Sequence, residues 1–218
     1  MKTGSSRKNG WLKCIGVTLL YFVLMLGDLI STYIGTPDLS EESNFLVALF
    51  GQGWTEMIVG NFLGVVIIFL LAYYTFVRYQ SPAIQCSGLR EYVSMLLFEC
   101  PDKFRWVFIK SPKNKLLSLA PAGYASVIVG ISFKVLAVGN NLISHYIPEL
   151  YPCLFCFLKV SHTYCNAVHF HTSRGILHIP VVGLGVIIIV AIFTYHYWFF
   201  REYKRNKKAL TRLENAPA

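Results

Sequence analysis

Long uninterrupted runs of apolar residues dominate the hydrophobic pattern of this chain. A helix that crosses a membrane needs about 20 mostly apolar residues, because each residue advances about 1.5 Å through a hydrocarbon core about 30 Å thick. Four segments meet this requirement: residues 11–35, 55–77, 117–140 and 176–200. An unpaired backbone amide in lipid costs several kcal/mol, so all four should be helices. The pattern therefore predicts an all-α, polytopic membrane protein with one membrane domain, a four-transmembrane-helix bundle over residues 1–218.

The first apolar segment also has features of a secretory signal peptide, since basic residues precede it. Its apolar stretch is longer than the core of such a peptide, and no A-x-A-like cleavage pattern follows it. We therefore expect this segment to be a retained span.

Basic residues set the expected orientation, because cytoplasmic flanks of spans are enriched in lysine and arginine. Both predicted termini and the loop of residues 78–116 are basic, whereas the predicted outer loops carry only Lys159 and Arg174. We expect the N-terminus, this loop and the tail of residues 201–218 to be cytoplasmic, in a plasma or inner membrane. The basic residues in these three regions are Lys2, Arg7, Lys8, Lys13; Arg78, Arg90, Lys103, Arg105, Lys110, Lys113, Lys115; and Arg201, Lys204, Arg205, Lys207, Lys208, Arg212.

Composition narrows the class of protein further. Only 14% of the residues are charged, against about a quarter in soluble domains, and 15% are aromatic. These values argue against a soluble enzyme and a disordered chain. The net charge of +9 fits basic flanks that meet anionic membrane lipids, so we expect lipid partners and no nucleic acid.

Two predicted loops contain apolar runs that are too short to span. Residues 91–100 and 103–110 of the cytoplasmic loop should form interfacial helices, which either pack on the membrane surface or dock a partner protein. The outer loop of residues 141–175 has two prolines and an apolar run at residues 154–160. It should be structured or re-enter the membrane.

Two ionisable residues lie deep inside predicted spans, Asp28 in the first and Lys134 in the third. Counting residues at about 1.5 Å each places both, together with Asn61 of the second span, about 10 Å below the outer boundary. An ionisable residue inside a span indicates a functional site. We expect an Asp28–Lys134 ion pair within a polar layer. The alternative is that the pair only fixes helix register.

More polar residues should surround this layer on the outer side. The candidate lining of an outward-facing pocket adds five residues to Asp28, Asn61 and Lys134: Thr32, Glu42, Asn44, Asn141 and His145.

The predicted outer loop also collects ligands of the kind that zinc prefers. Its sequence gives C-x2-C-x5-H-x2-C-x3-H-x-H from Cys153 to His171. Three interpretations stay open: a metal site, with zinc as the candidate, at His162, His169 and His171; a disulfide, of which Cys153–Cys156 is one candidate, on the oxidising side; and ordinary loop packing. His178, ahead of the fourth span, is either a headgroup contact or a ligand.

Short motifs give two resemblances. D-x-x-S-T at Asp28–Thr32 and E-x-N at Glu42–Asn44 resemble a widespread uncharacterised prokaryotic family of small multi-pass membrane proteins, over about the first 80 residues. The chain has Phe45 where that family has proline, and the resemblance implies no activity.

A fainter likeness, in LGDLISTY and VGNNLIS, is to lipoprotein signal peptidase, which uses two catalytic aspartates. This chain has Ser144 at the second matching position, so that dyad is not expected.

We therefore predict a membrane protein that binds a lipid, an ion or a protein partner through the outward-facing pocket. Its expected partners are membrane lipids and either another protein or further copies of itself in a homo-oligomer. The first alternative is a membrane-embedded hydrolase or transferase, metal-dependent in one version, that acts on a lipid-linked substrate at the outer leaflet. The second is an immunity or exclusion protein that acts by helix contact.

Overall fold

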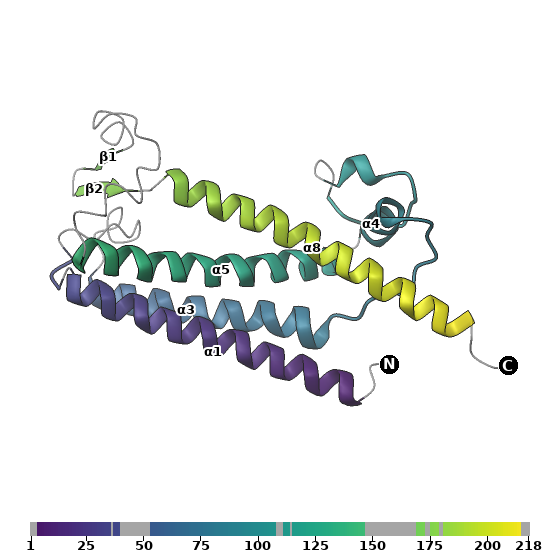
Figure 1. Ribbon diagram of the computed structural model, residues 1–218, viewed down its shortest axis with the longest axis horizontal. Helices are drawn as coiled ribbons and strands as arrows, with labels where there is room; N and C mark the ends of the chain where they lie inside the picture. Colours follow the sequence, from purple (N-terminus) through teal and green to yellow (C-terminus); the bar gives the residue numbers. More distant parts are fainter. Residues whose placement is uncertain are drawn as a thin grey trace. The chain divides into compact units, whose positions relative to one another are not determined.

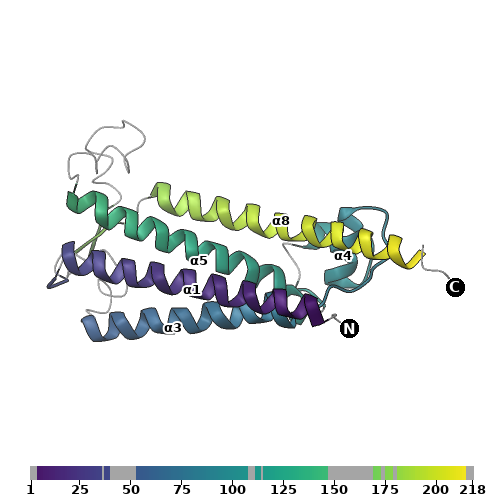
Figure 2. The same cartoon turned by 60° about the horizontal axis from the view of Figure 1, so that its bottom comes forward.

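The computed structural model describes residues 4–35, 37–39, 53–107, 111–113, 115–146, 169–172, 175–178 and 181–214. For residues 4–7, 106, 140, 143–145, 169–172, 175–178, 181–184, 213 and 214 it describes the backbone alone. The described part is mainly helical (Figure 1, Figure 2). Its elements are α1 (Gly4–Gly35), α3 (Trp54–Ala72), η1 (Tyr73–Arg78), α4 (Leu89–Phe98), η2 (Phe104–Trp106), α5 (Lys115–Tyr146), β1 (His169–Thr172), β2 (Gly175–His178) and α8 (Val181–Glu214).

Three of these helices are long and apolar enough to cross a membrane. They cover Lys8–Gly35, Trp54–Arg78 and Lys115–Gly139. These stretches contain nearly all of the first three predicted spans. By their length and composition these three helices are candidate membrane spans, which is consistent with a membrane protein.

The prediction for the start of the fourth span was wrong. We expected helix from residue 176, but Ile176–His178 belong to strand β2 and α8 begins only at Val181. Pro180 stands directly before Val181 in the sequence. The residue before a proline is disfavoured in the helical region, which explains why the helix does not extend back towards Leu177.

The contacts group the chain into two compact units, and each is described by itself. The first unit contains residues 1–16, 69–128 and 191–218, and the second contains residues 17–68 and 129–190.

A buried aromatic and aliphatic core holds the first unit together. Trp198 and Phe199 of α8 pack in one cluster with buried residues of α4. Asn206 adds polar contacts, because its side chain both accepts a hydrogen bond from the backbone N–H of Ile84 (2.9 Å) and donates one to the Ile84 carbonyl (2.7 Å). The α4 residues buried in this unit are Tyr92, Val93, Ser94, Leu96, Leu97 and Phe98.

This core changes the interpretation of the two short apolar runs. The run at residues 91–100 does form a helix, α4, but its apolar residues are buried against protein. Of the run at residues 103–110, the structure describes residues 103–107, which contain a single 3₁₀ turn at Phe104–Trp106. The helix-breaking effect of Pro101 and the turn at residues 101–102 keep α4 short.

Helix α3 ends in a π-helical segment, η1, also in the first unit. Gly10 of α1 lies against it so closely that a Cβ there would clash with the carbonyl oxygen of Phe76. Thr75 of η1 donates a hydrogen bond of 3.4 Å to the carbonyl of Ala120 on α5. Tyr74 donates to the carbonyl of Leu116. Small residues and hydroxyl donors thus tie three helix ends together, as is typical of membrane helices.

In the second unit, β1 and β2 form an antiparallel hairpin. Its register pairs His169 with His178, Phe170 with Leu177, His171 with Ile176 and Thr172 with Gly175.

Candidate functional site

The candidate site is built around the predicted ion pair, which the structure confirms. Lys134 Nζ on α5 donates a hydrogen bond of 2.5 Å to Asp28 Oδ2 on α1, within the second unit. The exposed fractions of the two side chains are 8% for Lys134 and 15% for Asp28. Removing such charges from water costs several kcal/mol per ion, so each charge depends on its partner.

Asn61 of α3 is the second acceptor for the Lys134 ammonium. The distance from Lys134 Nζ to Asn61 Oδ1 is 2.6 Å. The amide nitrogen of Asn61 donates back to the carbonyl of Met57 at 2.9 Å, which fixes the side chain with its oxygen towards the lysine. Lys134 therefore joins an acceptor from α1 to an acceptor from α3.

Asn141 reaches the other side of Asp28 from one helical face of α5, since seven residues separate it from Lys134. Its Nδ2 donates to Thr32 Oγ1 at 3.0 Å, to Ser31 Oγ at 3.1 Å and to Asp28 Oδ1 at 3.4 Å. Ser31 in turn donates to the Asp28 carbonyl at 3.0 Å. Both oxygens of Asp28 thus accept hydrogen bonds from α5. We call these residues, Asp28, Ser31, Thr32, Asn61, Lys134 and Asn141, the charged cluster.

Small residues allow the three helices to approach closely beside the charged cluster. A Cβ at Gly64 of α3 would lie 3.0 Å from the hydroxyl oxygen of Tyr21, and one at Gly130 of α5 would lie 3.0 Å from Ile68 Cδ1. Tyr21 is itself only 8% exposed. Short polar side chains can meet across helices only where the backbones come close, so these glycines position the cluster.

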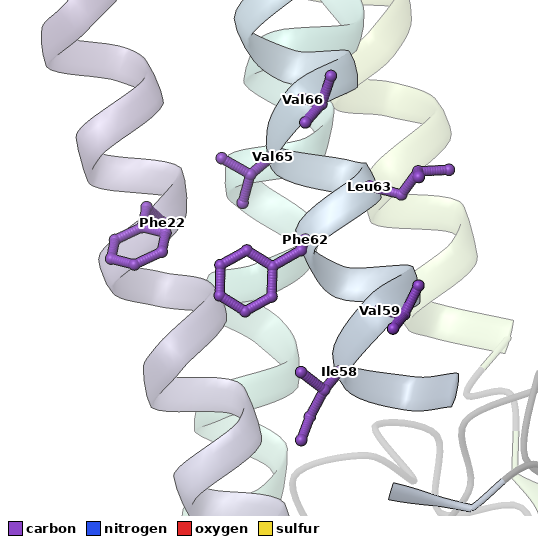
Figure 3. Close-up of a pocket in the computed structure, with 7 residues that line it drawn as sticks. All are labelled: Phe22, Ile58, Val59, Phe62, Leu63, Val65 and Val66. Atoms are coloured by element: carbon purple, nitrogen blue, oxygen red, sulfur yellow. The ribbon is translucent and has the colours of Figure 1, made fainter. Parts of the chain in front are cut away.

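An apolar groove on the same unit involves two of the same helices. It has a volume of about 410 Å³ and an almost wholly apolar lining. Figure 3 shows Phe22 of α1 facing Phe62 of α3, with ring centroids 6.1 Å apart. The remaining lining residues all come from α3: Ile58, Val59, Leu63, Val65 and Val66.

Several other predicted site residues fall where their side chains are not described. Glu42, Asn44, Cys153, Cys156 and His162 lie outside the described residues. His145 lies in α5, and His169 and His171 lie in β1; only their backbones are described. Among the side chains that the structure describes, no group of three or more His, Cys, Asp or Glu could hold a metal ion.

One contributor to the site, Ser31, was not predicted. Its hydroxyl accepts a hydrogen bond from Asn141 and donates one to the backbone carbonyl of Asp28. The signal for Ser31 was its place three residues after Asp28, which puts it on the same helical face. Serine in a membrane helix often bonds to its own backbone, which makes its contact with another helix hard to predict.

Comparison of the chain with protein families, with curated proteins and with solved structures finds no match. The two resemblances drawn from short motifs therefore stay predictions.

Proposed function

We propose that this membrane protein binds a zwitterionic lipid through the charged cluster, with the lipid tails along the apolar groove. In this proposal α8, which carries the fourth apolar run of the sequence, completes a four-span bundle with both termini in the cytoplasm. The proposal makes the cluster an outward-facing binding site.

The ion pair between Lys134 and Asp28 is the observation that carries the proposal. A zwitterionic headgroup has a phosphate that can replace Asp28 as the partner of the ammonium, and a cationic group that can replace Lys134 as the partner of the carboxylate. Exchange of the internal pair for the headgroup leaves neither charge unpaired, which avoids the penalty of an isolated buried charge. Asn61 and Asn141 can hold the two charged side chains in place during the exchange.

The apolar groove favours a lipid over an ion or a protein. Its lining offers acyl chains contact with Phe22 and Phe62, and α1 and α3 supply both the groove and part of the charged cluster. A ligand with a polar head and apolar tails matches both features of the unit.

The test is to measure which lipids remain bound after purification. The wild-type protein and the Asp28→Asn/Lys134→Met double variant are extracted in the same mild detergent, and bound phospholipid is quantified by native mass spectrometry. The double variant removes both charges and leaves none unpaired, so it should fold. Charge-assisted hydrogen bonds contribute about 1.5–3 kcal/mol each, so lipid affinity should fall about tenfold or more.

His196→Ala provides a matched control, because His196 lies on α8 in the first unit and its ring nitrogen is 2.8 Å from the Ile192 carbonyl. It should retain lipid as the wild type does. Equal retention by wild type and double variant would contradict the proposal and leave the pair with a purely structural role.

The same preparations separate the alternatives taken from the sequence. A co-purifying protein, with lipid retention unaffected by the double variant, would favour the immunity or exclusion function. Turnover of a lipid-linked substrate that depends on Asp28 would favour the hydrolase or transferase.

A further inference from the structure

The charged cluster holds its own cation by hydrogen bonds to oxygen atoms. Lys134 Nζ donates to Asp28 Oδ2 at 2.5 Å and to Asn61 Oδ1 at 2.6 Å. Among the described side chains, the cation–π contacts belong to other lysines and arginines and not to Lys134. A ligand cation that takes the place of Lys134 beside Asp28 therefore meets a lining that suits N–H donors.

More oxygen acceptors lie beside Asp28 on the same helix. Ser31 Oγ and Thr32 Oγ1 are 3.1 and 3.0 Å from the Asn141 amide nitrogen, which also lies 3.4 Å from Asp28 Oδ1. A primary ammonium carries three N–H donors and no acceptor, so it can use several such oxygens at once. A quaternary ammonium has no N–H donor, and proteins recognise it chiefly with aromatic rings.

The cluster also leaves little room for a bulky cation. The Lys134 and Asp28 side chains are only 8% and 15% exposed, and a Cβ at Gly64 would lie 3.0 Å from the Tyr21 hydroxyl oxygen. A methyl carbon approaches an oxygen to about 3.3–3.6 Å, and the nitrogen that bears it lies further away. A trimethylated nitrogen therefore cannot reproduce the 2.5 Å contact that Asp28 makes with Lys134.

We propose that the charged cluster selects phospholipids whose headgroup carries a primary ammonium, the phosphoethanolamine class, over those that carry a quaternary ammonium. The inference rests on the proposed function and specifies the ligand of that same site. The headgroup ammonium donates to Asp28 in place of Lys134, and the Lys134 ammonium donates to the phosphate.

A phosphoserine headgroup should bind less well, although it also has a primary ammonium. Its extra carboxylate would enter the site near Asp28 without a cationic partner, which is costly in a largely buried place. The proposed ligand is therefore zwitterionic as well as a hydrogen-bond donor.

The test is competition between headgroups on the delipidated full-length protein in detergent. Phosphatidylethanolamine and phosphatidylcholine with identical acyl chains are offered in equal amounts, and the bound lipids are counted by native mass spectrometry. The loss of a charge-assisted hydrogen bond weakens binding about tenfold or more, so the wild type should bind the ethanolamine lipid in about that excess. N-methyl and N,N-dimethyl ethanolamine lipids should bind progressively less.

Two variants show whether the preference arises in the charged cluster. Asp28→Asn/Lys134→Met should bind the two lipids equally, because the carboxylate that receives the ammonium is gone. His196→Ala, on α8 in the first unit, should keep the wild-type preference.

The outcomes separate this inference from the proposed function. Equal binding of the two lipids by the wild type, or an excess of the choline lipid, would overturn the headgroup selection while lipid binding itself stands. A preference that survives in the double variant would also overturn it. A wild type that binds neither lipid would overturn the proposed function and this inference together.

Discussion

At the scale of single residues, the molecule is defined by how it keeps two charges inside apolar helices. Lys134 donates to one carboxylate and one amide, and Asp28 accepts from Lys134 and Asn141. Because both side chains are largely buried, neither charge can turn to solvent when its partner is lost. The contribution of the pair to the free energy of unfolding can therefore be measured by replacing one of the two residues and then both.

Lys134→Met should destabilise the protein strongly, by about 3–5 kcal/mol, because Asp28 remains as a buried and uncompensated carboxylate. The double variant Asp28→Asn/Lys134→Met should regain most of this loss. Reversible unfolding in mixed detergent micelles gives the four free energies of the cycle. A double variant that costs as much as the two single variants added together would show that the pair has no energetic coupling.

Much of this cluster could be predicted, because an ionisable residue in a span is rare and needs a partner. Counting residues from the span ends placed Asp28, Asn61 and Lys134 at one depth, and the three do meet. Ser31 could not be singled out in the same way, since its contact with Asn141 depends on the rotation of two helices relative to each other.

At the scale of elements, close helix contacts decide how the secondary structure packs. Gly10 of α1 sits against the backbone of η1, and Gly123 of α5 is so near that a Cβ would lie 2.7 Å from Thr75 Oγ1. These contacts leave no space for a side chain. A glycine in such a contact is needed for helix packing, whereas a glycine with open space around it affects only the stability of its own helix.

Gly10→Ala should therefore destabilise the protein by about 1–3 kcal/mol, the usual cost of overpacking, because the new methyl group meets a backbone oxygen that cannot rotate away. Gly16→Ala on the same helix is the control. A Cβ at Gly16 meets nothing within 4 Å, so this change should be neutral or stabilise α1 by up to about 1 kcal/mol. Equal unfolding free energies for the two variants would contradict the contact between α1 and η1.

Alkaline pH should loosen the first unit through Tyr92 of α4. Burial raises the pKa of Tyr92 from 10.0 to about 12, despite a weak hydrogen bond of 3.5 Å with Ser81. Below pH 10 the phenol keeps its proton in both the folded and the unfolded chain, so the full stability is present. As the pH rises from 10 to 12, the unfolded chain loses the proton first, and about 2–3 kcal/mol of stability is lost.

Tyr92→Phe removes the titrating hydroxyl and should flatten this part of the stability profile. Some slope should remain, because burial also raises the pKa of Tyr79. Unfolding monitored by tryptophan fluorescence at pH 9, 10, 11 and 12 gives the two profiles. Identical slopes for wild type and variant would show that Tyr92 is not buried as described.

The elements differ in how well the sequence predicts them. The first three spans were predicted almost to the residue, since each is an apolar run whose backbone must satisfy its own hydrogen bonds in lipid. The burial of α4 against Trp198 and Phe199 was not predicted, because it depends on contacts between residues about a hundred positions apart. The hairpin was missed because four-residue strands give too short an alternation to recognise.

At the scale of the whole molecule, the distribution of basic residues predicts a membrane topology with both termini in the cytoplasm. Single cysteines placed at Ser5, Ser43 and Pro217 in a background whose native cysteines are replaced would test it. In intact cells an impermeant thiol reagent should label the position at Ser43 and leave the two terminal positions unlabelled until the membrane is opened. Labelling of either terminus in intact cells would contradict an even number of spans with this orientation.

The most direct test of the central claim is the stabilisation of the purified protein by lipid. A zwitterionic phospholipid is titrated into delipidated protein in detergent, and the melting temperature is followed for the wild type and for Asp28→Asn/Lys134→Met. Ligands that bind only the folded state stabilise it by mass action, about 2.7 kcal/mol at a hundred times Kd. A rise in the melting temperature of the wild type that is absent from the double variant is the predicted result. An equal rise in both would contradict a role for the charged cluster in lipid binding.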